Sequence, residues 1–271
     1  MKKRKHFKAR LLDRKTILAV SAVVFLIVLT AFRDDIAKAW WEKYRMGSVA
    51  IFLAQSDAAF LAELGNYYFN GGAYNLKNAA RAYEKATRLD PTLQWGHYQL
   101  ARIYFAEGKY DEALDEINTE QKLYSENFRA YYVRGLIYGY RTDLGKAETD
   151  FREFIKWAPR EWAGYNDLAW ILTLRNNYRD AEDVIRQAFH TVPEGTKNPW
   201  LWNSLGVAEL NRGENAKAAH SFEEAKKLAA GLTENDWARA YPGNDKKTAE
   251  DGLKSFRETI EENLSRSKVS P

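Results

Sequence analysis

The sequence predicts an all-α solenoid, in which short repeats stack side by side instead of folding into one globule. Pro91, Pro159 and Pro193 are spaced by 68 and 34 residues, and Ser125 occupies the remaining place in this series. Small residues keep the same spacing, twelve positions before each of these four places: Ala79, Ala113, Ala147 and Ala181. A fixed period of this length is typical of repeat arrays, in which each unit contacts only its neighbours.

The charge and composition of the chain exclude several functions. The net charge is +4, but the first 15 residues carry eight Lys or Arg against Asp13, so the remainder is slightly acidic. Nucleic-acid binding needs basic residues gathered on one face, and an acidic body argues against it. The chain has no cysteine and its four histidines are scattered, so we expect no enzymatic activity, metal site or cofactor.

An apolar segment near the start of the chain predicts a membrane anchor. Residues 16–32 carry no charge and lie between Lys15 and Arg33. As a helix they span roughly 25 Å, which is the short end of what crosses a bilayer. A buried core helix would have a polar face, which this segment lacks. A cleaved signal peptide would have small residues close behind it, whereas the only Ala-x-Ala lies at residues 37–39, so we expect an uncleaved transmembrane helix.

The charges around this segment predict its orientation. The basic residues 1–15 precede it and Asp34-Asp35 follows it, which places the N-terminus in the cytoplasm. Everything after the helix then lies on the extracytoplasmic side, which is periplasmic in a Gram-negative cell. Residues 33–57 are helical in pattern, and we expect a juxtamembrane helix that leads into the array. The alternative is a first, degenerate solenoid helix with Trp40 and Trp41 on its apolar edge.

The repeats resemble those of the tetratricopeptide repeat family. The family pattern is W-x2-L-G-x2-Y, followed by Ala, Phe, Ala and Pro. Its clearest match here is Trp202-x2-Leu205-Gly206, followed by Phe222. Five copies align, at residues 58–91, 94–127, 128–161, 162–195 and 199–230. The resemblance implies that residues 58–230 form pairs of antiparallel helices in a right-handed superhelix.

Some positions depart from the family pattern. Glu120 and Phe154 stand where small residues belong, and Ser125 replaces a Pro, so we expect an irregular junction between the second and third repeats. The turn within each repeat needs a residue that tolerates positive φ. Thr142 departs from this need, which the other four turns meet with Gly72, Gly108, Asn176 and Gly213.

The last residues, 231–271, predict a linker and a capping helix. A terminal repeat needs a polar lid over its apolar face. A helix starting with a capping box at Thr248 would place Leu253, Ile260 and Leu264 on one face. We expect this face to pack on the fifth repeat.

The family resemblance also implies which residues face a partner in the concave groove. Its groove positions carry over to Asn66, Trp95, Tyr98, Arg102, Phe105, Arg129, Tyr132, Asn166, Trp170, Trp200 and Asn203, with Phe69, Tyr140 and Asn211 as further candidates. The alternative for each aromatic residue is packing between neighbouring helices. Asn166 and Asn203 occupy the same position in successive repeats, where an amide can donate to and accept from an extended peptide.

Together these features predict a membrane-anchored scaffold that binds protein on the extracytoplasmic side and helps to assemble or tether a membrane or envelope complex. The expected partners are an extended peptide or a helix of another chain in the groove, and the lipid bilayer through residues 16–32. We expect no nucleic-acid partner. The alternative is an accessory subunit permanently integrated into a large membrane complex, whose contacts would be larger and more apolar.

Overall fold

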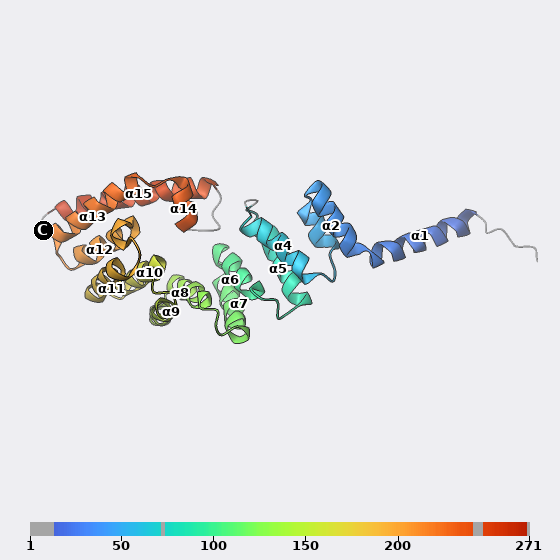
Figure 1. Cartoon of the computed structure of the whole chain (residues 1–271), viewed down its shortest axis with the longest axis horizontal. Coiled ribbons are helices and arrows are strands. Elements are labelled where there is room, and N and C mark those ends of the chain that lie inside the picture. Colours follow the sequence, from blue (N-terminus) through green and yellow to red (C-terminus); the bar gives the residue numbers. More distant parts are fainter. Residues whose placement is uncertain (1–13, 72–73, 241–245, 270–271) are drawn as a thin grey trace, which may run out of the picture.

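The computed structural model describes residues 14–71, 74–240 and 246–269, and within these ranges the chain is helical, without strands (Figure 1). The predicted all-α solenoid is therefore confirmed. Most of the basic leader, together with Gly72 and the Pro242-Gly243 part of the predicted linker, lies outside the described residues.

Five pairs of helices form the array, one pair within each predicted repeat. They are α4 (Ala58–Phe69) with α5 (Leu76–Leu89), α6 (Gly96–Ala106) with α7 (Tyr110–Leu123), α8 (Arg129–Tyr140) with α9 (Leu144–Trp157), α10 (Trp162–Leu174) with α11 (Tyr178–Thr191), and α12 (Pro199–Asn211) with α13 (Asn215–Ala230). Within each pair the two helices pack along one another, and the second helix of a pair packs on the first helix of the next. This arrangement leaves successive repeats stacked in one direction.

The first helices of the pairs form the inner side of the array. Helices α6, α8, α10 and α12 contact one another in series. The side on which successive elements approach most closely is the concave side of a curved stack. The first helices therefore line the groove.

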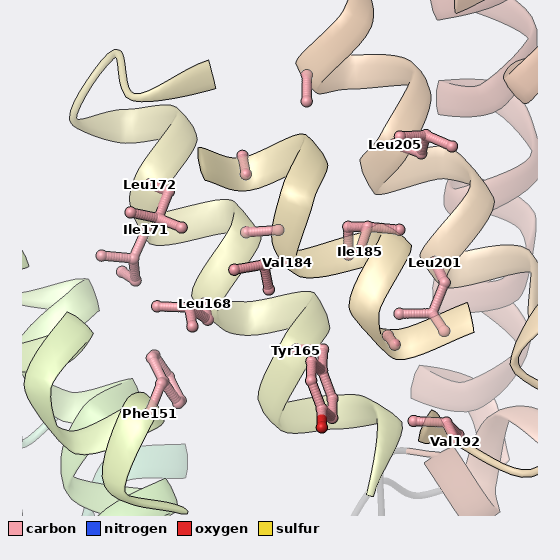
Figure 2. Packing of buried hydrophobic residues seen from close by; sticks show 14 of the residues in the cluster. Phe151, Tyr165, Leu168, Ile171, Leu172, Val184, Ile185, Val192, Leu201 and Leu205 are labelled. Carbon is pink, nitrogen blue, oxygen red and sulfur yellow. The ribbon is translucent and has the colours of Figure 1, made fainter. Parts of the chain in front are cut away.

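The same contact, between a small residue of the first helix and a larger residue of the second, recurs in the core of every pair. In the first, third and fifth repeats a glycine of the first helix lies against an aromatic ring of the second, as Gly206 lies against Phe222. In the second and fourth repeats the same places hold Ala and Ile, and Ala169 lies in one buried cluster with Ile185. Small residues here let the two helices cross closely. Figure 2 shows the surrounding cluster, in which Tyr165 and Leu168 also lie.

The described turns within the second to fifth repeats have the left-handed residue that the sequence predicts. Gly108 and Gly213 have φ values of 73° and 76°, and Asn176 has 61°. Thr142, whose side chain does not suit this geometry, adopts it as well, with a φ of 64°. The second to fifth repeats share this turn conformation, so Thr142 accepts a conformation that is unfavourable for a β-branched residue.

Residues 14–57, the described part of the chain before the array, contain three helices: α1 (Arg14–Ala31), α2 (Arg33–Tyr44) and α3 (Gly47–Leu53). By length and composition, no single helix in the described part of the chain qualifies as a membrane span. Residues 14–28 and 33–44 qualify together as a pair bent by 74°. Figure 1 shows α1 extending away from the rest of the molecule.

Helices α2 and α3 pack as an additional pair on the first repeat, which favours the solenoid alternative for residues 33–57. Trp41 is buried, and its ring lies 4.7 Å from that of Tyr67, whereas the neighbouring Trp40 is exposed. The Lys38 ammonium lies 2.7 Å from the Asp57 carboxylate. Lys85 of α5 donates to the carbonyl oxygen of Ile51, at 2.9 Å. The segment is thus tied to the array and is not a free spacer.

The chain ends in α14 (Glu234–Ala240) and α15 (Lys246–Lys268), and α15 lies along α13 (Figure 1). Leu253, Ile260 and Leu264 are buried, as the predicted capping role requires. The helix begins at Lys246, before the expected capping box, so Thr248 lies within its first turn.

Candidate protein-binding groove

Residues of the first two repeats form one end of the groove. The Arg102 guanidinium lies 4.7 Å from the ring centroid of Phe69 and 5.7 Å from that of Tyr98. Phe69 itself is buried, so it supports Arg102 and does not face a partner directly. Asn66 is exposed, and its Oδ1 accepts a hydrogen bond from Asn70 at 2.7 Å. The Trp95 ring packs edge-on against Tyr98, at 5.5 Å.

An exposed aromatic cluster occupies the middle of the groove. The Tyr140 ring lies 5.2 Å from Phe105, 6.0 Å from Tyr110 and 5.5 Å from Trp170. Tyr140 is 56% exposed, whereas Phe105 and Trp170 are partly buried. The structure thus brings together three predicted groove residues from three successive repeats. A rigid aromatic surface of this kind supplies contact area at low entropic cost.

A chain of hydrogen bonds joins three first helices beyond this cluster. The Tyr132 hydroxyl of α8 donates to Asp167 of α10 at 2.7 Å. The Asn166 Nδ2 donates to the other carboxylate oxygen of Asp167 at 3.0 Å, and the Ser204 hydroxyl of α12 donates to Asn166 Oδ1 at 2.8 Å. Burial raises the pKa of Asp167 to about 6, while the two hydrogen bonds act in the opposite direction. The chain of bonds fixes the spacing of the first helices.

Asp167 and Ser204 were not among the predicted site residues. The sequence carries a signal for Asp167, because it is the only charged residue in α10. A charge in an otherwise uncharged helix needs partners within the fold. Nothing comparable marks Ser204.

The two predicted asparagines differ in their environment. Both polar atoms of the Asn166 amide are engaged within the protein. The Oδ1 atom of Asn203 is buried and has no hydrogen-bond partner in the structure. A buried carbonyl oxygen without a partner is energetically unfavourable, and a hydrogen bond from a donor would remove this cost. Asn203 therefore keeps an unused acceptor, whereas the Asn166 amide is already engaged within the fold.

Trp200 does not face an open groove, contrary to the sequence-based expectation. Its ring stacks between Trp162, at 5.0 Å, and Phe256 of α15, at 5.5 Å, and Trp237 of α14 lies 6.2 Å away. Only 8% of Trp200 is exposed. The C-terminal helices cover this end of the groove, and the repeat pattern carries no information about their position.

Two further predicted residues, Arg129 and Asn211, are exposed and contact residues near them in the sequence. Arg129 is exposed, with its guanidinium 5.0 Å from the ring of Phe128. Asn211 is exposed near the end of α12, and its Nδ2 donates to the carbonyl of Val207 at 2.8 Å. In the described ranges, no group of three or more His, Asp or Glu side chains could hold a metal ion.

Comparison with known sequences identifies the repeats. Sequence models of the tetratricopeptide repeat family match residues 72–124 and 128–161. A co-chaperone of Cryptococcus neoformans with tetratricopeptide repeats and a J domain, DNJ1, is 29% identical over 100 residues. The TPR repeat-containing protein PA4667 of Pseudomonas aeruginosa is 26% identical over 158 residues. The matches cover 37% and 55% of this chain, but only 19% and 26% of the two relatives.

Solved structures with the same fold extend the comparison to most of the chain. MamA matches with a TM-score of 0.55 and 16% identity, over 68% of this chain and 95% of MamA. YrrB, described as a TPR protein with an unusual peptide-binding site, matches with a TM-score of 0.54 and 17% identity, over 69% of this chain and 93% of its own. TTC0263 of Thermus thermophilus matches with a TM-score of 0.55 and 17% identity, over 77% of this chain and all of its own.

The sequence matches and the shared fold lead to one conclusion. Residues 72–124 and 128–161 are tetratricopeptide repeats, and the whole array shares the fold of solved tetratricopeptide repeat proteins. Such arrays are scaffolds for protein–protein interaction, and their function depends on the partners they hold.

Proposed function

We propose that this chain is a membrane-anchored scaffold whose groove binds a protein partner on the extracytoplasmic side. The observation that carries the proposal is the inner face of the array, where exposed Tyr140 and the unpaired amide oxygen of Asn203 lie on first helices of different repeats. Aromatic side chains such as Tyr140 are among the residues that dominate binding energy in protein interfaces, and the Asn203 oxygen offers an acceptor on the same row of helices. The partner helps to form, or is held beside, a membrane or envelope complex.

An extended peptide suits this groove well. A peptide backbone presents alternating N–H donors and carbonyl acceptors. One of its N–H groups can donate a hydrogen bond to the Asn203 oxygen, which acts only as an acceptor. The name of the structural relative YrrB states that it has a peptide-binding site. The co-chaperone relative also carries tetratricopeptide repeats, although this chain spans 19% of its length. Both comparisons favour a polypeptide ligand.

The anchoring role is supported by the surface of α1. Its large apolar side chains, including Leu18, Phe25 and Ile27, are exposed along the whole helix. Monomeric soluble proteins rarely expose an apolar surface of this extent, because covering it releases free energy in proportion to its area. A bilayer would cover it, with the basic leader held in the cytoplasm.

The topology can be tested by cysteine labelling, because the natural chain has no cysteine. Lys3→Cys and Ser125→Cys each introduce one thiol, on either side of α1. We expect a membrane-impermeant maleimide to label position 125 only in right-side-out vesicles and position 3 only in inverted ones. Labelling of both positions in the same vesicles, or loss of the protein from membranes in alkaline carbonate, would reject the anchor and leave the protein-binding groove untouched.

A further inference from the structure

A pocket of about 190 Å³ lies at the junction of the second and third repeats, where the sequence departs from the family pattern. It is lined by Gln94, Trp95, Glu120, Tyr124, Glu126, Asn127, Phe128 and Arg129. We propose that this pocket binds a basic side chain, lysine or arginine, of the partner polypeptide. The proposal rests on the proposed protein-binding function only for the source of that side chain.

Glu120 places a carboxylate at the base of the pocket. The residue is 1% exposed, and one carboxylate oxygen accepts a hydrogen bond from the backbone N–H of Tyr98 at 3.2 Å. That N–H lies in the first turn of α6, whose N-cap residue Trp95 supplies no side-chain cap. Glu120, which lies in α7, therefore caps the other helix of its own pair. Burial raises the pKa of this carboxyl group, because it removes the charged form from water, while the hydrogen bonds from Asn127 and Tyr98 act in the opposite direction.

Asn127 adds an unpaired acceptor to the same wall. Its Nδ2 donates to the other carboxylate oxygen of Glu120 at 2.8 Å, which fixes the orientation of the amide. The Oδ1 atom is left buried without a hydrogen-bond partner in the structure, and the residue is only 7% exposed. Leaving an acceptor in this state costs about 1–3 kcal/mol. A ligand that carries N–H donors removes this cost.

The rim of the pocket suits a ligand with an apolar stem. Trp95 is held in the left-handed region, with a φ of 67°, and its indole is exposed at the entrance. Phe128 also lines the pocket, and the Arg129 guanidinium lies over the face of its ring, 5.0 Å from the centroid. Among the lining residues, the two acidic side chains of Glu120 and Glu126 outnumber the one basic side chain, that of Arg129. Lysine and arginine side chains have an apolar methylene stem and a positively charged end that donates hydrogen bonds. The stem suits the aromatic walls of the pocket, and the charged end suits its acidic floor.

The carboxylate in the pocket comes from Glu120, a residue that departs from the repeat pattern. A small residue, as the family has at the place of Glu120, would bring no carboxylate into this junction. The irregular junction expected from Glu120 and Ser125 is thus a candidate side-chain pocket next to Trp95 and Arg129, two of the predicted groove residues.

Disulfide tethering tests the pocket without a known partner. Gln94→Cys places the only thiol of the full chain at the pocket, and Thr149→Cys places it on the exposed surface of α9 as a matched control. In detergent, each variant is equilibrated with equal amounts of the symmetrical disulfides of N-(6-aminohexanoyl)cysteamine and N-heptanoylcysteamine and a limiting amount of 2-mercaptoethanol, so that adducts form by reversible thiol–disulfide exchange. These two probes differ only in an ammonium or a methyl group at the end. Mass spectrometry gives the ratio of the two adducts.

We expect the ammonium probe to be favoured at least tenfold at position 94 relative to position 149. The additional substitution Glu120→Gln, which keeps the shape and one acceptor, should abolish this preference without unfolding the protein, as circular dichroism will show. Equal ratios at the two positions, or preference for the methyl probe at position 94, would overturn the proposal. Neither outcome would affect the proposed binding of protein by the groove.

Discussion

Gly206 of α12 lies directly against the ring of Phe222 of α13, and a Cβ atom at Gly206 would stand 2.6 Å from the ring carbon Cε1. The same glycine–aromatic contact joins Gly65 to Tyr83 and Gly135 to Phe151. The other two repeats use Ala and Ile. The size of one residue in each first helix therefore sets the size of its partner in the second.

This relationship predicts a compensated pair of substitutions. Gly206→Ala should destabilise the chain by about 2 kcal/mol, because the added methyl group overlaps a ring that cannot move in a packed core. Adding Phe222→Ile should recover most of the loss, since it recreates the pair formed by Ala169 and Ile185. Urea unfolding of both single variants and the double variant measures the coupling. Strictly additive effects would show that the two residues are independent.

Thr142→Gly should stabilise the protein by about 1 kcal/mol, since the left-handed conformation is unfavourable for a β-branched residue and free for glycine. The matched reverse changes, Gly108→Thr and Gly213→Thr, occupy the equivalent turns and should destabilise by a similar amount. Thermal unfolding compares the three variants. A lower melting temperature for Thr142→Gly would contradict the assignment of strain to this turn.

Asp167 should make stability fall as the pH rises from about 4 to about 6. Its folded pKa of about 6 lies above the ordinary value of 3.8, so the folded state holds the proton more tightly than the unfolded state. Asp167→Asn removes this dependence, and its stability relative to the wild type should increase across that range by on the order of 2 kcal/mol. Tyr132→Phe removes a hydrogen bond to the charged form and should move the range to higher pH. Chemical unfolding at several pH values measures both effects, and a constant difference between Asp167→Asn and the wild type would refute them.

The two asparagines should separate stability from binding. Asn166→Ala breaks hydrogen bonds to Asp167 and Ser204 and should destabilise the array by about 1 kcal/mol. Asn203→Ala removes an oxygen that has no partner and should leave the free energy of unfolding nearly unchanged. Urea unfolding of the two variants checks this difference. Equal losses would mean that Asn203 is structural as well.

The sequence predicts the helix pairs well because the spacing of small and large residues reports contacts that recur in every repeat. It predicts the surroundings of individual groove residues less well. Trp200 matches a groove position, but its burial depends on α14 and α15, which follow no repeat. Thr142 departs from the turn pattern, yet the backbone imposes the conformation. The roles of Asp167 and Glu120 depend on their hydrogen-bond partners on neighbouring helices. The repeat period along the chain does not reveal these partners.

The central claim is that the face formed by the first helices binds a protein partner, and site-specific photocrosslinking tests it most directly. Tyr140 in the groove and Trp157 at the end of α9 are equally exposed, at 56% and 57%, so each can be replaced by p-benzoylphenylalanine in the full chain. On irradiation of native membranes, we expect discrete protein adducts from position 140, weakened by Asn203→Ala, and none from position 157. Adducts from position 157 alone would contradict the claim and favour a permanently integrated subunit that is held through its outer face.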